Sequence, residues 1–582
     1  MTALGALLAY VHRSVGQLPV RLAPPRRAMA GDTMEIDAPT LRGLEVFTSA
    51  SGCNGALMSV LDRTVTPAGR RLLARQLSAP LTRPTLIERR LAMVECFVTD
   101  AQVRRDCRDE LERLPDMLRA CGRLSLSKAG PRDLASLREG LDRAVVLAER
   151  LCEVTSISPG VASAARDLGQ AGKGSCGALL QMLRQSLVAH PPASVAEMGF
   201  VAEGYAARVD AASIALRRAQ DAIEALQARY IAETGIKSLR VRTNSTIGYH
   251  VEVPTSSGGK LQSGFVLRQG LASTTRFSSA ELDAAAICLE EARNKAASAE
   301  EVVFTELANA AMIEREALTR VAHAAAALDL IAGLAQAAAE GGWTKPVLTT
   351  DTWLDVEGGR HPVAEHVLAA QGRAFVGNDC RMGEDGRLWL LTGPNMAGKS
   401  TFLRQVAVIV LMAQIGSFVP ARSARIGVVD KLFSRIGASD DLAAGRSTFL
   451  VEMLETAAIL NGATHRSLVI LDEVGRGTST HDGLAIAQAC MENLHDVVRC
   501  RTLFATHFHE LADTADAMSH AKCMAMDAAA GRHGDIFAYK VKEGRAGRSY
   551  GLKAAALAGL PQSVIDRASA LMAAFHDDRG KA

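Results

Sequence analysis

The sequence predicts a multidomain protein of helical and α/β parts, and three observations support this fold class. The 582-residue chain is too long for one ordinary core. Residues 36–235 and 280–341 carry mainly helical patterns, and an alternating apolar and polar stretch separates them. In residues 346–570, short β-branched strands alternate with helices, which is typical of an α/β sheet with crossover helices.

The first helical part follows a Pro- and Arg-rich linker that ends near residue 30. Within 85–98, the spacing of Leu86, Leu91, Val94 and Phe97 predicts that they lie near one helix face. The second helical part, 280–341, is very rich in alanine, which has high helix propensity and little bulk. We expect long helices in close contact there.

A small β-rich insert is predicted between these helical parts. The segment "LRVRTNSTIGYHVEVP" (239–254) alternates apolar and polar residues around an Asn-containing turn, which indicates a hairpin. The segment "SGFVLRQGLASTTRF" (263–277) is expected to complete the module.

Composition restricts the functional class. The formal net charge is only +3, so the chain is not a uniformly basic coat for nucleic acid, and a polyanion site must be a local patch. Eleven scattered cysteines without a CxxC pair fit a reducing cytoplasm. The apolar stretch 406–419 is shorter than the roughly 20 residues of a membrane span, so it predicts a buried helix. The N-terminus has no basic residue before its apolar run and is a poor secretion signal.

The first motif of the α/β part with a chemical function is a phosphate loop. Gly393-x-x-x-x-Gly398-Lys399-Ser400 follows an apolar strand and precedes a helix-forming run. Glycines let backbone N–H groups converge on phosphate oxygens, and the helix N-terminus adds a positive dipole end. Lys399 can then reach the β- and γ-phosphates of a nucleotide, and Ser400 can bind Mg²⁺.

An acidic pair ends a second apolar strand. Asp472 and Glu473 close "SLVILDE", where carboxylates are costly unless they are paired or metal-bound. One carboxylate can serve the Mg²⁺ shell, and the other can orient an attacking water.

Between these motifs, Ser447 and Thr448 are predicted to cap the start of a helix. The whole order is phosphate loop, capped helix, acidic strand end, "GRGTST" loop, and His507 after the strand "TLFAT". This order resembles the ATP-binding-cassette class of ATPases, in which the capped helix contacts the partner subunit's nucleotide and two subunits form composite sites. The pair His507 and His509 is weak evidence for a metal site, because no set of carboxylate partners accompanies it.

The motifs "TGPNMAGKSTFLRQ", "DDLAAGRSTFLVEM", "LDEVGRGTSTHDGLA" and "FATHFHEL" together resemble the MutS family of mismatch-repair ATPases. Further similar segments are "MEIDAPTLRGLEV", "LRVRTNSTIGYHVEV", "RQGLASTTRF", "GRHPVAE" and "RSYGLKAAALAGLP", in family order. The resemblance implies a connector remnant or linker (1–30), a helical core and lever domain (31–219 and 280–345), a DNA clamp (220–279), an ATPase and dimerisation domain (346–570), and a tail (571–582).

The resemblance also implies ATP and Mg²⁺ as ligands and assigns roles to residues of this chain. Glu473 would position the water, His507 would sense or polarise the γ-phosphate, and Asp472 and Ser400 would hold Mg²⁺. Ser447 and Thr448 would act on the partner's nucleotide. Phe375 matches the position that stacks on adenine, although a core aromatic is an equally open reading on sequence alone. The loop residues expected around the nucleotide are Gly393, Pro394, Asn395, Met396, Ala397, Gly398, Lys399, Ser400 and Thr401.

Double-stranded DNA, a second copy of the chain and a MutL-type repair protein are the implied partners, in the cytoplasm with the nucleoid and without a membrane. Where the family usually has Lys-Asn in the clamp, this chain has Ala272-Ser273. The contacts expected with phosphates would be independent of sequence and sensitive to salt. A solvated basic face is the other open reading. The candidate residues are Lys237, Arg240, Arg242, Lys260, Arg268 and Arg276.

No segment here corresponds to the family's mismatch-reading stretch, which resembles Gly-Asp-Phe-Tyr-Glu and wedges an aromatic ring into the duplex. We therefore expect little preference for a G·T duplex over a homoduplex. Three alternatives remain beside a conventional family member: a paralogue that binds branched or recombining DNA, a partial product of a full-length gene, and a transporter ATPase subunit. The clamp-like insert and the lack of a membrane segment disfavour the last.

Overall fold

The computed structural model describes residues 2–15, 31–49, 52, 55–155, 157–261, 264–394, 397–437, 448–527, 538–545, 552, 555 and 559–579. The chain forms two compact units. The first comprises residues 1–23, 114–148 and 166–323, and the second comprises residues 24–113, 149–165 and 324–582. Helices α8 (Pro131–Glu153), α9 (Pro159–Gly169) and α13 (Arg315–Gly341) continue from one unit into the other.

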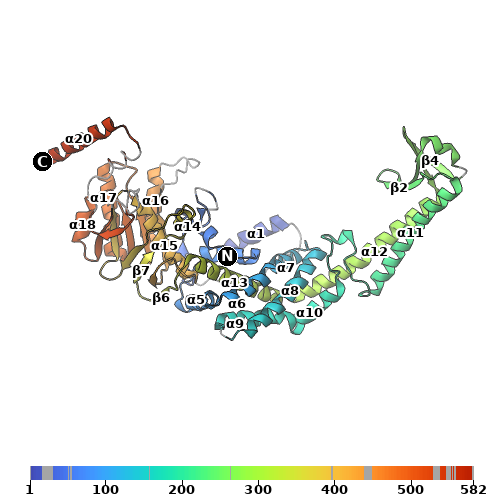
Figure 1. Ribbon diagram of the computed structural model, residues 1–582, viewed down its shortest axis with the longest axis horizontal. Coiled ribbons are helices and arrows are strands. Elements are labelled where there is room, and N and C mark those ends of the chain that lie inside the picture. Colours follow the sequence, from blue (N-terminus) through green and yellow to red (C-terminus); the bar gives the residue numbers. More distant parts are fainter. Residues whose placement is uncertain are drawn as a thin grey trace. The chain divides into compact units, whose positions relative to one another are not determined.

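Long helices dominate the first unit. Helices α11 (Ala207–Thr234) and α12 (Ala280–Ile313) lie side by side and carry a small sheet at one end (Figure 1). Ser279 caps α12 by accepting a hydrogen bond from the backbone N–H of Leu282 (3.1 Å), so the last strand of the sheet leads directly into the helix. The helices of this unit are α1 (Thr2–Val15), α7 (Met117–Ser125), α10 (Gly174–Ser186), α11 (Ala207–Thr234) and α12 (Ala280–Ile313).

The small sheet is antiparallel, with strand order β2-β3-β5-β4. Its apolar face packs on α11 and α12 through Tyr230, Val251, Val253 and Leu282, all buried. The predicted hairpin and its completing segment are confirmed, and they lie inside the range expected for the clamp. The strands are β2 (Arg240–Asn244), β3 (Gly248–Pro254), β4 (Phe265–Gly270) and β5 (Thr274–Ser279).

The second unit is organised around a seven-stranded sheet with order β1-β11-β12-β13-β9-β14-β15. Only β15 pairs antiparallel, and the other neighbours are parallel. The strands read from sequence as "LWLLTG", "SLVILDE" and "RTLFATH" are β9, β12 and β13, which neighbour one another. The strands are β1 (Glu35–Ile36), β9 (Leu388–Thr392), β11 (Lys431–Arg435), β12 (Leu468–Asp472), β13 (Arg501–Ala505), β14 (Ala521–Met526) and β15 (Val541–Glu543).

A second sheet, with order β6-β10-β7-β8, lies in the same unit. Its strands are β6 (Val347–Thr349), β7 (Leu354–Gly359), β8 (Asn378–Met382) and β10 (Ser423–Gly427). The remaining helices are α2 (Ala38–Gly43), α3 (Leu57–Leu61), α4 (Pro67–Ser78), α5 (Pro84–Thr99), α6 (Ala101–Glu112), α14 (Pro362–Ala370), α15 (Lys399–Gln414), α16 (Thr448–Gly462), α17 (Thr480–Glu492), α18 (Leu511–Ala517) and α20 (Gln562–Arg579).

An unexpected strand begins this unit. β1 pairs in parallel with β11, although its segment resembles the start of the helical core. The following helix α2 is tied to the same strand, because Thr40 Oγ accepts a hydrogen bond from the N–H of Ser434 (2.8 Å). Residues 35–43 therefore belong to the seven-stranded sheet and the elements packed against it.

Two helix predictions have clear outcomes. In α5 the predicted apolar face is wrong at Leu86, which is 37% exposed, whereas Ile87 is buried with Leu91, Val94 and Phe97. Positions 87, 91 and 94 follow the 3.6-residue period, and Leu86 lies one residue off it. The stretch 406–419 is mostly the buried part of α15, as expected.

Helix α13 is long and apolar enough to cross a membrane, and 83% of its apolar window is buried within the protein. Protein contacts thus already cover most of this helix. Ten cysteines lie in the described part, and each is a free thiol.

Candidate nucleotide-binding site

The phosphate-loop sequence lies between β9 and α15, as its strand–loop–helix context predicts. Gly393 and Gly398 both have positive φ, +128° and +94°, which side chains rarely adopt. A Cβ at Gly398 would also lie 3.3 Å from the Tyr539 ring. Pro394 and Ala397 form a tight turn, in which the N–H of Ala397 donates to the carbonyl of Pro394 (3.1 Å). Asn395 and Met396 lie outside the described residues.

Lys399 begins α15 and is completely buried. Its Nζ has no hydrogen-bond partner among the residues that the structure describes. Burial lowers the pKa of this ammonium group, and the charges of Asp472 and Glu473 oppose that shift. A buried cation without a hydrogen-bond partner is costly, and a phosphate anion would supply the missing contacts.

Ser400 and Asp472 meet across the site. Ser400 Oγ donates to Asp472 Oδ2 (2.7 Å), and Asp472 Oδ1 has no hydrogen-bond partner within the described ranges. Burial raises the pKa of Asp472, whereas the bond from Ser400 acts against that shift. A hydroxyl and a carboxylate with a spare oxygen are hard oxygen ligands, so this pair fits Mg²⁺.

Glu473 follows directly and has an unusual backbone, with φ +62°. Its N–H donates to the carbonyl of Ala505 (2.9 Å), which anchors it beside the end of β13. Its carboxylate contacts His507 Nε2 and forms an ion pair with Arg476 (2.5 Å). Such strained positions cluster at functional sites.

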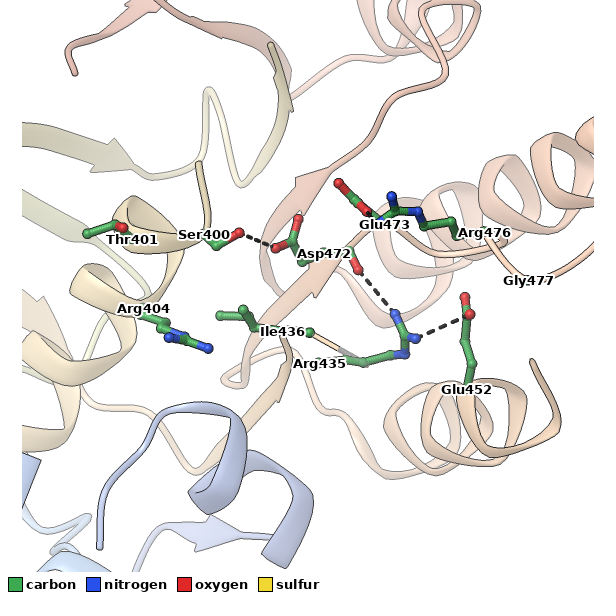
Figure 2. A pocket seen from close by; sticks show the side chains of 11 residues that line it. Ser400, Thr401, Arg404, Arg435, Ile436, Glu452, Asp472, Glu473, Arg476 and Gly477 are labelled. Atoms are coloured by element: carbon green, nitrogen blue, oxygen red, sulfur yellow. Dashed lines mark hydrogen bonds and ion pairs between the residues drawn. The ribbon is translucent and has the colours of Figure 1, made fainter. Parts of the chain in front are cut away.

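Ser400, Asp472 and Glu473 line a cavity of about 420 Å³. Figure 2 shows Ser400 and Asp472 directed at one another from the helix and the strand, with Glu473 and Arg476 beside them. Its wall carries three arginines and three carboxylates, so the positive charge that favours a phosphate comes from Lys399 and the N-terminus of α15. Its lining consists of Ser400, Thr401, Arg404, Arg435, Ile436, Gly437, Glu452, Asp472, Glu473, Arg476 and Gly477.

A second cavity of about 460 Å³ is bounded by Gly398 and Thr401 and has a largely apolar wall. Phe375, predicted to stack on adenine, is half-buried and lines it. Tyr539 lines it too, and sequence reasoning missed this residue. The side chain of Asn378 positions it, donating to the Tyr539 carbonyl (2.9 Å) and accepting from the N–H of Val541 (2.8 Å).

Helix α16 begins at Thr448, where the capped helix was expected. Ser447 lies outside the described residues, as does the side chain of Thr448. The proposed contacts of both with a partner's nucleotide stay predictions.

The candidate DNA contacts lie in or beside the small sheet of the first unit. In the strand register, Arg240 and Arg276 both pair with Glu252, and Arg242 lies two residues from Arg240 on the same face. Glu252 forms ion pairs with Arg276 (3.1 Å) and Arg242 (3.6 Å), so a carboxylate lies among these arginines. Arg268 instead donates to Ser278 (2.8 Å). The exposed members of the set are Lys237, Arg240, Arg242, Lys260 and Arg268.

In comparisons with known proteins, two models of one family match most of the chain. Residues 39–335 match MutS domain III, and residues 389–576 match MutS domain V.

Proteins named "DNA mismatch repair protein MutS" are among the most similar relatives. That of Erythrobacter litoralis is 45% identical over 98% of this chain and 65% of its own length. Those of Nitrobacter winogradskyi and Zymomonas mobilis are 45% and 44% identical over 100% of this chain and 67% of their own lengths. The chain thus spans about two thirds of the length of these relatives. The chain belongs to the MutS family.

Proposed function

We propose that this chain is an ATP-hydrolysing, DNA-binding component of DNA mismatch repair. Two copies would form composite nucleotide sites, and the nucleotide would change how the clamp holds DNA. The observation that carries the ATPase part is the buried Lys399, whose Nζ has no hydrogen-bond partner in the described ranges, beside the Ser400–Asp472 pair. The names of the similar relatives support the repair role.

In this proposal the triphosphate occupies the 420 Å³ cavity and the base occupies the 460 Å³ cavity. Lys399 and the N-terminus of α15 would hold the phosphates. Ser400 and Asp472 would hold Mg²⁺, which neutralises charge on the transferred phosphate when it is bound. The rings of Phe375 and Tyr539 would contact adenine, because both line the second cavity.

Glu473 would orient the attacking water. Its carboxylate contacts His507 through Oε1 and Arg476 through Oε2, and each oxygen keeps a further lone pair that can accept a water proton. Catalytic contacts often take their final form only when substrate is bound. His507 would then face the γ-phosphate region beside Glu473.

The remaining parts of the proposal concern assembly. Ser447 and Thr448 at the start of α16 would complete the site of a second copy, which makes a homodimer the active form. Basic residues of the small sheet would contact DNA phosphates, and a MutL-type protein would be a further partner. Cytoplasmic localisation and the domain limits given above remain part of this proposal.

Paired substitutions test the proposed site in the purified full chain. Lys399→Ala should abolish turnover and weaken ATP binding, because the buried cation is lost. Glu473→Ala should keep ATP affinity within a few-fold and slow hydrolysis by about 100-fold or more, because it removes only the base. Fluorescent-nucleotide titration and steady-state phosphate release measure the two effects. Near-normal hydrolysis by Lys399→Ala, or lost ATP binding by Glu473→Ala, would contradict the assignment.

A further inference from the structure

We propose that Arg435 and Glu452 are positioning residues that couple the start of α16 to Asp472 and Glu473 of the same subunit. Occupancy of one nucleotide site would thereby set the turnover of the other. This inference rests on the proposed function, because it takes α16 to contact the partner's nucleotide.

Glu452 connects the helix to the turn that follows the acidic pair. It lies near the start of α16 and is 5% exposed. Its Oε1 accepts a hydrogen bond from the N–H of Gly475 (2.6 Å), two residues after Glu473. A Cβ at Gly475, which has φ +87°, would lie 2.8 Å from Gly483 Cα, so this turn is tightly packed against α17. Displacement of α16 therefore acts on the turn that follows Glu473.

Arg435 makes the second connection. It ends β11, is 8% exposed, and pairs in register with Leu471 of β12. One guanidinium nitrogen donates to the carbonyl of Asp472 (3.1 Å), and the other forms an ion pair with Glu452 Oε2 (3.2 Å). Figure 2 shows both contacts from the same guanidinium.

This ion pair is buried, so it holds the end of β11 and the start of α16 together. Removing one member of a buried pair leaves an uncompensated charge, so the pair resists separation. The backbone of Asp472, the turn at Gly475 and the start of α16 are thus held by two side chains. When α16 moves onto the partner's nucleotide, both carboxylates of its own site are expected to move with it.

Heterodimers isolate this effect. One protomer, the reporter, keeps an intact site. Its partner carries either Glu473→Ala, which in the proposed function binds ATP without hydrolysing it, or Lys399→Ala, which weakens ATP binding so that its site stays mostly empty at ATP concentrations that fill the reporter's site. Phosphate release then comes from the reporter alone. The ratio of reporter turnover with an occupied and with an empty partner site defines a coupling factor.

With a wild-type reporter we expect a coupling factor of about fivefold or more, within the usual range for linked sites. Glu452→Gln in the reporter should bring the factor below about twofold. Arg435→Met with Glu452→Met should do the same without leaving one charge buried alone, so it decides the result if the single variant folds poorly. Because Glu452 and Arg435 line the cavity proposed for the triphosphate, the reporter's ATP affinity is titrated for each variant and turnover is compared at ATP concentrations that saturate the reporter. Circular dichroism and thermal melting confirm folding.

Glu455→Gln is the matched control. Glu455 lies on the same helix, is 28% exposed and approaches Arg435 Nε only to 3.9 Å, so its loss should preserve the coupling factor. The inference is overturned if the Glu452 and double variants keep the wild-type factor, if Glu455→Gln loses as much, or if the wild-type factor is below twofold. Failure of the proposed function appears separately, as wild-type protein that does not hydrolyse ATP or turnover that survives Lys399→Ala.

Discussion

The pKa values of Lys399 and Asp472 are both shifted in the direction that favours the neutral form of the group. Burial lowers the pKa of the lysine and raises that of the aspartate, and each group partly offsets the shift of the other. Burying these two groups in their charged forms is therefore costly. A ligand that binds only the folded state adds stability that grows with its concentration. In the proposed function, Mg²⁺ and ATP would offset this cost.

Phe375→Ala tests the base-binding cavity at the residue scale. Loss of one aromatic face should weaken ATP binding by about 2- to 12-fold, from roughly 0.5–1.5 kcal/mol of ring contact. Melting temperature should change little, because the ring is only half-buried. Titration with a fluorescent nucleotide and a thermal melt provide the two readouts.

Phe375→Tyr keeps the ring and is the control, with ATP affinity expected near that of wild type. Unchanged ATP affinity with a large loss of stability in Phe375→Ala would favour the alternative that this residue is a core aromatic.

Residues of the phosphate loop were predictable because their spacing is local and their chemistry is restrictive. Lys399 and Ser400 are adjacent to the glycines that define the loop, and Asp472 closes a clearly apolar strand. Tyr539 was not predictable. Its place in the cavity depends on Asn378, which is distant in sequence and reaches it only through tertiary packing.

At the scale of elements, helix α4 depends on a close approach by α13. Asp329 is completely buried on α13 and accepts hydrogen bonds from the N–H of Val65 (2.9 Å), the N–H of Thr66 (2.8 Å) and Thr66 Oγ (2.5 Å). Thr66 in turn caps α4 by accepting from the N–H of Gly69 (2.9 Å). This network fixes the start of α4 against α13.

Gly69→Ala should therefore destabilise the protein. A Cβ at this position would lie 2.7 Å from Asp329 Cγ, and three hydrogen bonds prevent that carboxylate from moving. We expect a loss of about 1–3 kcal/mol, typical of overpacking, seen as a lower melting temperature. Gly122→Ala in α7 is the matched control. Nothing lies within 4 Å of its added Cβ, so it should stabilise by about 0.5–1 kcal/mol.

Helix α14 should respond to pH through its cap. The N–H of Ala364 donates to His361 Nδ1 (3.3 Å), which requires that nitrogen to be unprotonated. Burial, with a smaller contribution from Arg404, lowers the pKa of His361 to about 4. Because this value lies below the unfolded-state pKa of about 6.5, the contribution to stability is complete above pH 6.5 and is lost as pH falls toward 4.

At pH 5 wild-type protein should have lost about 2 kcal/mol relative to pH 7 through this residue. His361→Asn keeps a capping acceptor and cannot be protonated, so its melting temperature should fall less between pH 7 and pH 5. Equal slopes for the two proteins would show that His361 does not cause the acid sensitivity.

Elements marked by a local run of one residue character were predictable from sequence, whereas those made by distant pairing were not. The alanine-rich helices and the short, mainly apolar strands β9, β12 and β13 each extend over five or more residues. β1 has only two residues and pairs with β11, far along the chain, so no local pattern marks it. The prediction that Leu86 lies on the buried face was wrong for a related reason. Leu86 and Ile87 are adjacent and both apolar, so the sequence leaves the position of the buried face ambiguous by one residue.

At the scale of the whole molecule, the candidate nucleotide site lies in the second unit and the small sheet lies in the first. The chain passes between the units within helices such as α8 and α13. A nucleotide can change the grip on DNA only if it binds two arrangements of the protein with different affinity. DNA binding by variants of the small sheet should therefore be measured both with and without ATP.

Opposite changes on the exposed face of that sheet should have opposite effects on DNA binding. Arg242→Ala removes a guanidinium that is 64% exposed, and should weaken duplex binding and reduce the salt slope by about 0.9 if it contacts one phosphate. Glu252→Gln removes the carboxylate that pairs with Arg242 and Arg276, and should strengthen binding. Arg105→Ala, an exposed change on α6, is the control and should leave the affinity unchanged.

Fluorescence anisotropy with a duplex at several salt concentrations measures these effects, which should not depend on base sequence because phosphates carry them. If Arg242→Ala and Glu252→Gln both match wild type across the salt range, the arginines form an ordinary solvated face. The opposite signs are the decisive feature, because general destabilisation would weaken binding in both variants, whereas contact with a polyanion responds to the sign of the local charge.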